Sequence, residues 1–163
     1  MWKLIAGVVL MLSPAASAAA FDYGRYEDSS VEELIERASE FDIHESGQSV
    51  VTPPQPVHLY TALQRYPQPC SGELPTLLLR AIGISEAPQM NWCMTVRGES
   101  GQTVNLWVQD SFAPRIREEY ELGDGIELWA LWLFVNASDR KPYFIVNAIG
   151  PAITPPSESP DGT

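Results

Sequence analysis

Carboxylates are the most abundant groups in this chain that could do chemistry. Asp110 follows one apolar run and Asp124 precedes another, with Glu118, Glu119 and Glu121 close by in sequence. Two carboxyl groups in one cleft could act as general acid and base, and carboxylate oxygens also suit calcium. Aspartate is equally a turn-forming residue, which explains both positions more simply. A small envelope hydrolase using Asp110, Asp124 and a neighbouring Glu is therefore an alternative interpretation and not the leading one.

The two histidines, His44 and His58, lie outside any motif that would pair them with a nucleophile or a metal. The Gly-x-Ser-x-Gly elbow, which would place a catalytic serine on a sharp turn, does not occur in the sequence. We therefore expect ordinary histidines, no catalytic residues, no metal and no cofactor.

Cys70 and Cys93 are the two cysteines, and we expect them to form a disulfide. The bond would close a loop of roughly two dozen residues and contribute on the order of 3 kcal/mol, mainly by restricting the unfolded chain. A redox role is disfavoured because the pair lacks Cys-x-x-Cys spacing. Zinc is disfavoured because no histidines stand at ligand spacing.

The first twenty residues predict a secretory signal peptide. Lys3 supplies a positive start, Leu4 to Leu12 is an apolar run, and Ala16-Ser17-Ala18 is a small-residue cleavage site. The run is about half the length that a membrane-spanning helix needs, so we expect cleavage and no membrane span in the mature chain. The predicted location is periplasmic or secreted.

Charge narrows the choice of partners. The chain carries 21 acidic and 10 basic side chains, a formal net charge of −11. Non-specific nucleic-acid binding depends on Lys and Arg that contact phosphates, and the basic residues here are scattered singly in the sequence. We therefore expect neither a nucleic acid nor an anionic membrane as partner.

The segment 21–73 is predicted to be a short helical extension. Ser30 and Glu33 stand in capping-box register before an amphipathic stripe that begins at Leu34. Residues 48–52 suit a short strand, and Val57–Tyr66 has apolar residues at helical spacing after a proline-rich break.

Residues 74–149 are predicted to be mainly β. Thr76–Ile84 suits either a helix or a bent first strand, and we favour the strand. Four further strands are expected at Trp92–Arg97, Thr103–Gln109, Ile126–Val135 and Tyr143–Ile149, with a possible short helix within 112–122. Because both faces of Ile126–Val135 are apolar, Trp129 and Trp132 are expected in the core. The segment 150–163 is expected to be a disordered tail.

Five strands with a polar segment between the third and fourth resemble the OB-fold. Three features carry the resemblance: Gly83 inside the first strand, Leu106–Asp110 ending the third, and the glycine turn Leu122–Ile126 entering the fourth. The expected fold is therefore mainly β, a five-stranded OB-like β-barrel at 74–149 preceded by the helical extension. The resemblance implies a binding face on strands two and three that takes oligonucleotides, oligosaccharides or proteins.

Asn105, Trp107 and Gln109 share one face of the third strand, so an amide-tryptophan-amide row could stack a sugar or a peptide. The alternative is that Trp107 lies under the N-terminal helices. With Arg97 at the rim, these residues form the predicted ligand-binding site. We predict a non-enzymatic binding module of the cell envelope that recognises a protein or a glycan, with protein favoured. A structural subunit of an envelope assembly is a further alternative.

Overall fold

A computed structural model of the chain describes residues 21–41 and 49–151. The predicted signal peptide, His44 and residues 152–163 of the predicted tail lie outside these residues. The elements, in chain order, are η1 (Tyr23–Arg25), β1 (Glu27–Ser29), α1 (Val31–Ser39), β2 (Val50–Pro69), α2 (Glu73–Ala81), β3 (Trp92–Arg97), β4 (Thr103–Val108), α3 (Ala113–Glu119), β5 (Gly125–Val135) and β6 (Pro142–Ile149).

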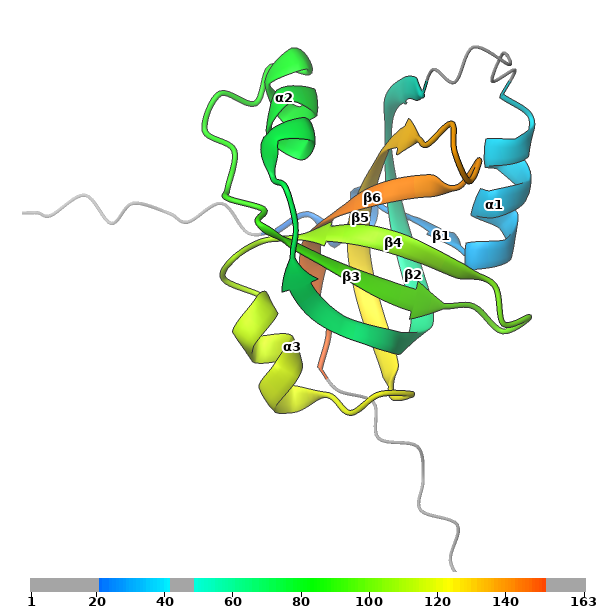
Figure 1. The fold of residues 1–163 in the computed structure, drawn as a ribbon, viewed down its shortest axis with the longest axis vertical. Helices are drawn as coiled ribbons and strands as arrows, with labels where there is room; N and C mark the ends of the chain where they lie inside the picture. Colours follow the sequence, from blue (N-terminus) through cyan, green and yellow to red (C-terminus); the bar gives the residue numbers. More distant parts are fainter. Residues whose placement is uncertain (1–20, 42–48, 152–163) are drawn as a thin grey trace, which may run out of the picture.

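The six strands form one mixed sheet that closes into a ring (Figure 1). The strand order is β1-β2-β3-β4-β6-β5, and β5 pairs back with β2 to close it. The β4–β6 and β1–β2 pairings are parallel, and the other pairings are antiparallel. Strand β1 adds to β2 beside Val57–Leu59. The fold is thus mainly β, as the sequence predicted.

Apolar side chains form two buried clusters. The larger one joins inward-facing residues of the ring strands to one face each of α1 and α3, and it includes the fully buried Trp132 and Phe144. The smaller one lies outside the ring, where Leu78 and Leu79 of α2 pack against Trp107 of β4 and neighbouring residues. Strand β5 contributes to both clusters, which explains why its sequence is apolar on both faces. Trp132 is in the core as expected, and Trp129 is half-buried.

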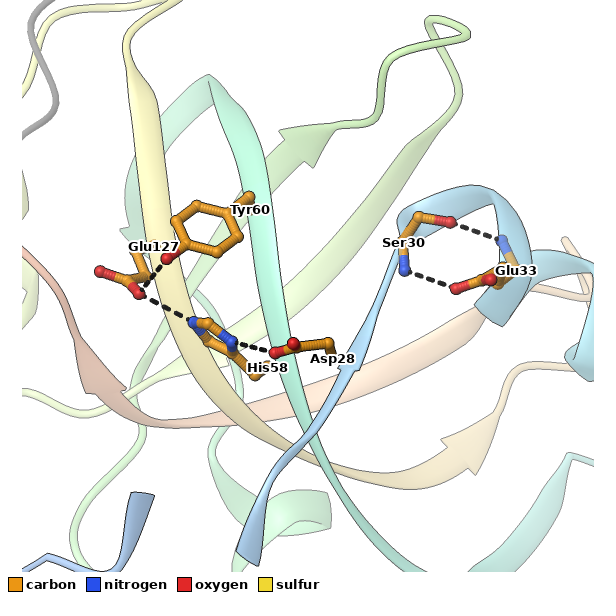
Figure 2. Close-up of polar contacts among 6 residues, drawn as sticks. All are labelled: Asp28, Ser30, Glu33, His58, Tyr60 and Glu127. Atoms are coloured by element: carbon orange, nitrogen blue, oxygen red, sulfur yellow. Dashed lines mark hydrogen bonds and ion pairs between the residues drawn. The ribbon is translucent and has the colours of Figure 1, made fainter. Parts of the chain in front are cut away.

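Helix α1 begins where the sequence predicted. The Ser30 side chain accepts a hydrogen bond from the Glu33 backbone N–H at 3.1 Å, and the Glu33 carboxylate accepts one from the Ser30 N–H at 2.9 Å. Figure 2 shows this reciprocal pair. Because two otherwise unpaired backbone donors are satisfied, the helix starts here and not a turn later. Val31 and Leu34 then bury its apolar face in the larger cluster.

The segment 21–73 is not a helical extension, because most of its second half is β2. Val57–Tyr66, predicted as a helix, lies within this long strand. Register shifts between Leu63 and Arg65, and between Arg65 and Gln68, break the regular alternation of inward and outward residues. A β-bulge adds one residue to a strand, so apolar residues on either side of it acquire a spacing that imitates a helix. The first strand of the ring therefore lies before residue 74.

The prediction of a first strand at Thr76–Ile84 is wrong, because α2 occupies most of this segment. Gly83 follows the helix with φ +91°, and the Ile84 N–H donates to the Leu79 carbonyl at 2.9 Å. This is the left-handed conformation that glycine adopts just past a helix end. Gly83 thus ends a helix and does not bend a strand.

The remaining predicted strands are confirmed as β3, β4, β5 and β6, with bounds that differ by at most one residue from the prediction. Helix α3 occupies the polar segment between β4 and β5, as expected. None of the helices in the described part of the chain is long and apolar enough to cross a membrane.

Candidate functional site

The predicted binding residues lie on the outer surface of the ring, on neighbouring strands. Thr95 of β3 pairs with Asn105 of β4, and Arg97 of β3 pairs with Thr103 of β4. Asn105 in turn pairs with Tyr143 of β6. Because alternate residues of a strand point to the same side, these positions form two adjacent rows across the sheet.

Trp107 occupies the covered end of this surface. Its side chain is 6% exposed and belongs to the cluster beneath α2. Its ring centroid lies 5.3 Å from that of Tyr143 and 6.0 Å from that of Phe134. Trp107 is therefore covered, as the alternative interpretation expected, but by α2 and not by the N-terminal helices. In this conformation the indole offers no free face on which a sugar or a base could stack.

Gln109 links elements of the fold. Its side-chain amide donates to the Val146 carbonyl at 3.1 Å, which ties the end of β4 to β6. Its own carbonyl accepts from the Phe112 N–H at 2.9 Å and so helps to start α3. Both contacts are structural, and nothing in them is directed at a ligand.

Asn105 lies at the centre of a hydrogen-bonded ladder that crosses three strands. The Thr95 hydroxyl donates to the Asn105 side-chain oxygen at 2.8 Å. The Asn105 amide nitrogen donates to the Tyr143 hydroxyl at 3.2 Å. All three side chains are half-buried, so the ladder is ordered by its own bonds and still reaches the surface.

Basic side chains surround this ladder. Arg65 of β2 pairs with Thr95 and is exposed, as is Arg97. The Lys141 ammonium donates to the Thr103 carbonyl at 2.8 Å. We call this surface the basic polar face; it consists of Arg65, Thr95, Arg97, Asn105, Lys141 and Tyr143.

A shallow depression of about 570 Å³ adjoins the basic polar face. Arg97 lines it, together with Tyr60 and the turn between β3 and β4. Gly98 in this turn lies against Glu32 of α1, so closely that a Cβ there would fall 2.3 Å from the carboxylate. The Glu32 carboxylate accepts from the Ser100 N–H at 2.8 Å and from its hydroxyl at 2.7 Å. These hydrogen bonds lower the pKa of Glu32 and fix the turn on α1.

A second polar network surrounds His58 on β2 (Figure 2). Its Nδ1 lies 2.6 Å from the Asp28 carboxylate, and its Nε2 lies 2.9 Å from that of Glu127. The Tyr60 hydroxyl donates to the same Glu127 oxygen at 2.7 Å, which raises the pKa of Tyr60. The imidazole also stacks on Trp129, with centroids 4.8 Å apart.

The Asp28–His58 contact resembles the acid–histidine half of a hydrolytic triad, but the second ring nitrogen of His58 faces a carboxylate. A triad requires a nucleophile at that position. The described residues place no serine or cysteine hydrogen-bonded to His58. The network joins β1, β2 and β5, so its evident role is to fasten β1 to the ring. Sequence analysis missed it because Asp28 and Glu127 lie 30 and 69 residues from His58.

The acidic residues of the alternative hydrolase bond to nearby main chain. The Asp110 carboxylate accepts from the Asn91 N–H and from its side-chain amide, both at 2.9 Å. The Asp124 carboxylate accepts from the Glu121 N–H at 2.8 Å within its turn. Glu119 pairs with Arg115 on α3. These contacts are those of turn and helix residues.

Ser138 and Lys141 stand at Ser-x-x-Lys spacing, which occurs in some acyl-transfer enzymes. The Ser138 hydroxyl donates to the Asn136 side chain at 3.0 Å, and the Lys141 ammonium donates to Thr103. The two groups therefore have separate partners and do not form a catalytic pair.

Within residues 21–41 and 49–151, no group of three or more His, Cys, Asp or Glu side chains could hold a metal ion. The predicted disulfide joins Cys70 to Cys93, so it closes the loop that carries α2. A groove of about 700 Å³ lies between α2 and residues 87–91, and Leu77 at its edge is 61% exposed.

Comparison with known protein families finds no family that matches the chain, and a search of curated proteins finds no relative.

Proposed function

We propose that this protein is a secreted or periplasmic, non-enzymatic binding module of the OB type that recognises a protein partner through its basic polar face. The observation that carries the proposal is the uncovered ladder of Thr95, Asn105 and Tyr143. It lies on the outer surface of β3, β4 and β6, and exposed arginines border it. In OB-folds the second and third strands carry the binding face, and β3 and β4 correspond to them.

Support for the OB assignment comes from the ring without β1. Five strands remain, a helix lies between the third and the fourth, and the turn that includes Gly123 precedes the fourth. The closure between β2 and β5 leaves no free edge along their shared length, which is how such folds avoid strand-to-strand aggregation.

The predicted location rests on two independent features of the chain. The first twenty residues have the pattern of a signal peptide. The Cys70–Cys93 disulfide is of the kind that persists in oxidising compartments.

The proposal is tested by pull-down of the oxidised protein from envelope extract. Wild type is compared with Arg97→Glu, and with Arg25→Glu as a charge-matched control. Arg25 is exposed on η1. Tyr23 of the same short helix packs on Trp129, away from the basic polar face. A partner recovered by wild type and Arg25→Glu but lost by folded Arg97→Glu would support the proposal. Identical recovery by all three proteins would contradict it.

A further inference from the structure

We infer that the basic polar face binds an acidic segment of the partner protein, in extended conformation. The inference rests on the proposed function, because it names the chemistry of the ligand at the same surface. Three features support it: the distribution of charge, the spacing of the cations, and the lack of a freely exposed aromatic ring within the basic polar face, although Tyr60 lies in the adjoining depression.

Charge is unevenly distributed over the strands of this molecule. The chain as a whole carries a net charge of −11. Strands β2, β3, β4 and β6 nevertheless contain no Asp or Glu at all, while Arg65 and Arg97 lie on two of them. Among the described residues neither arginine forms an ion pair. The basic polar face is thus a cationic surface on an acidic protein.

The charges nearest to a bound segment determine most of its electrostatic interaction with the protein. Exposed charges farther apart than about 8 Å are largely screened at physiological ionic strength. A short acidic segment that lies across the strands therefore meets Arg65, Arg97 and Lys141 first. The carboxylates nearest to the face, Glu99 and Asp139, lie in the turns beyond the strand ends. A long polyanion would also meet the acidic remainder of the surface, which disfavours nucleic acid.

The cations have the spacing that an extended peptide needs. Arg65 lies one strand from Thr95, and Arg97 lies two residues farther along β3. Neighbouring strands are about 4.8 Å apart and two residues of a strand span about 6.8 Å, so the two backbone positions are roughly 8 Å apart. Alternate side chains of an extended segment repeat at a similar distance. Each guanidinium can then hold one carboxylate in a bidentate pair.

The remaining groups of the face suit a peptide better than a sugar. Glycans and bases gain much of their affinity by stacking on exposed aromatic rings. Trp107 is buried, and the ring of Tyr143 packs on Trp107 and Phe134. The accessible groups are instead the Asn105 amide and the Thr95 hydroxyl, which can exchange hydrogen bonds with peptide groups.

The inference is tested by titrating isotopically labelled protein, with its disulfide intact, with a peptide of alternating Glu and Ser about ten residues long. Backbone amide chemical shifts locate the contact. We expect changes to concentrate at Thr95, Arg97, Asn105 and Lys141 and to weaken at high salt. The variant with both Arg65→Glu and Arg97→Glu should bind at least about tenfold more weakly, whereas Arg25→Glu should bind as wild type does.

Three comparison ligands are titrated in parallel: a Lys-Ser peptide, an oligogalacturonate and a single-stranded oligothymidylate. Tighter binding of the acidic peptide than of all three supports the inference. Equal or tighter binding of the sugar or of the nucleotide would overturn it, as would shift changes outside the basic polar face or changes that the double variant retains.

Failure here can be separated from failure of the proposed function. If the acidic peptide does not bind but Arg97→Glu still loses a partner in the pull-down, the ligand class is wrong and the binding module stands. If neither effect is seen, both proposals fall.

Discussion

The outer surface of β4 is completed in two different ways at its two ends. At the Trp107 end, α2 and its disulfide-bonded loop cover the sheet and turn that surface into a second core. At the Asn105 end, the half-buried ladder reaches the surface and the neighbouring Arg65 and Arg97 are exposed. The two residues are two positions apart on one strand and point the same way. What separates a buried residue from a partly exposed one here is therefore the insertion between β2 and β3, and not the strand itself.

The largest expected effect is at the covered end. Trp107→Ala should lower the free energy of unfolding by about 3–5 kcal/mol, because it empties a large buried site. Urea denaturation of the oxidised protein measures this. Asn105→Ala, on the open part of the same strand, serves as the control and should cost far less. A loss below about 1 kcal/mol for Trp107→Ala would mean that α2 does not seal this end.

Removal of the disulfide comes next. Replacing Cys70 and Cys93 by Ser should reduce the free energy of unfolding by about 2–4 kcal/mol, since the loop that they close regains freedom in the unfolded chain. The folded double variant should still bind through Arg97. Loss of binding at unchanged stability would show that α2 belongs to the binding surface, and the two ends of β4 would no longer differ in role.

The His58 network holds β1 on the ring, because both imidazole nitrogens lie beside carboxylates of other strands. His58→Ala should cost about 1–3 kcal/mol by leaving the half-buried Glu127 without its imidazole. Thermal unfolding reports this cost, and Tyr60→Phe, which removes one exposed hydrogen bond from the same carboxylate, is the milder control. If His58→Ala had wild-type stability but no longer recovered the partner protein in the pull-down, the network would have a binding role and not a structural one.

Substitutions of exposed residues near Asn105 should affect binding and leave the stability almost unchanged. Arg97→Glu should change the free energy of unfolding by no more than about 0.5 kcal/mol, because the side chain is exposed on the surface. Chemical denaturation beside wild type checks this. A large destabilisation would mean that Arg97 supports the sheet, and the pull-down result could then not be assigned to the face.

The smallest effect concerns the turn next to the open end. The pKa values of Glu32 and Glu33 are lowered from 4.5 by hydrogen bonds to Ser100 and to Ser30. Carboxyls with a depressed folded-state pKa stabilise the fold above their unfolded value and lose that contribution as pH falls through the folded value. Stability should therefore decline below about pH 4.5. In Glu32→Gln the decline should be shallower, as thermal unfolding across pH would show; an unchanged slope would exclude Glu32.

Strands β3 to β6 could be predicted because the sequence pattern that defines each of them lies within the strand and its flanking turns. Each has a run of alternating or wholly apolar residues bounded by turn residues, as in Gly98–Gly101 between β3 and β4. The capping box of α1 is local in the same sense, since Ser30 and Glu33 are three residues apart. The mainly β class followed from these elements even though the first strand was misplaced.

The errors arose where tertiary contacts override local pattern. Bulges in β2 produced helical spacing, and only its pairing with β3 and β5 reveals the strand. Leu78 and Leu79 suit a strand or a helix equally, and their packing on Trp107 decides between them. Arg97 and Asn105 could be placed on one face by alternation. Arg65 could not, because its neighbour Thr95 lies thirty residues farther along the chain and the strand that carries Arg65 was predicted to be a helix.

The length of β2 has a consequence for how the chain folds. Its residues pair with β5, where Tyr60 lies opposite Glu127 and Val50 opposite Val135. Such distant pairings lose loop entropy before any contacts form. Folding is therefore expected in milliseconds to seconds and not in microseconds. Until β5 pairs with it, β2 has an open edge from Val50 to Ala62. A chain truncated before residue 125 should therefore aggregate, because it lacks β5, which covers that edge of β2 in the folded protein.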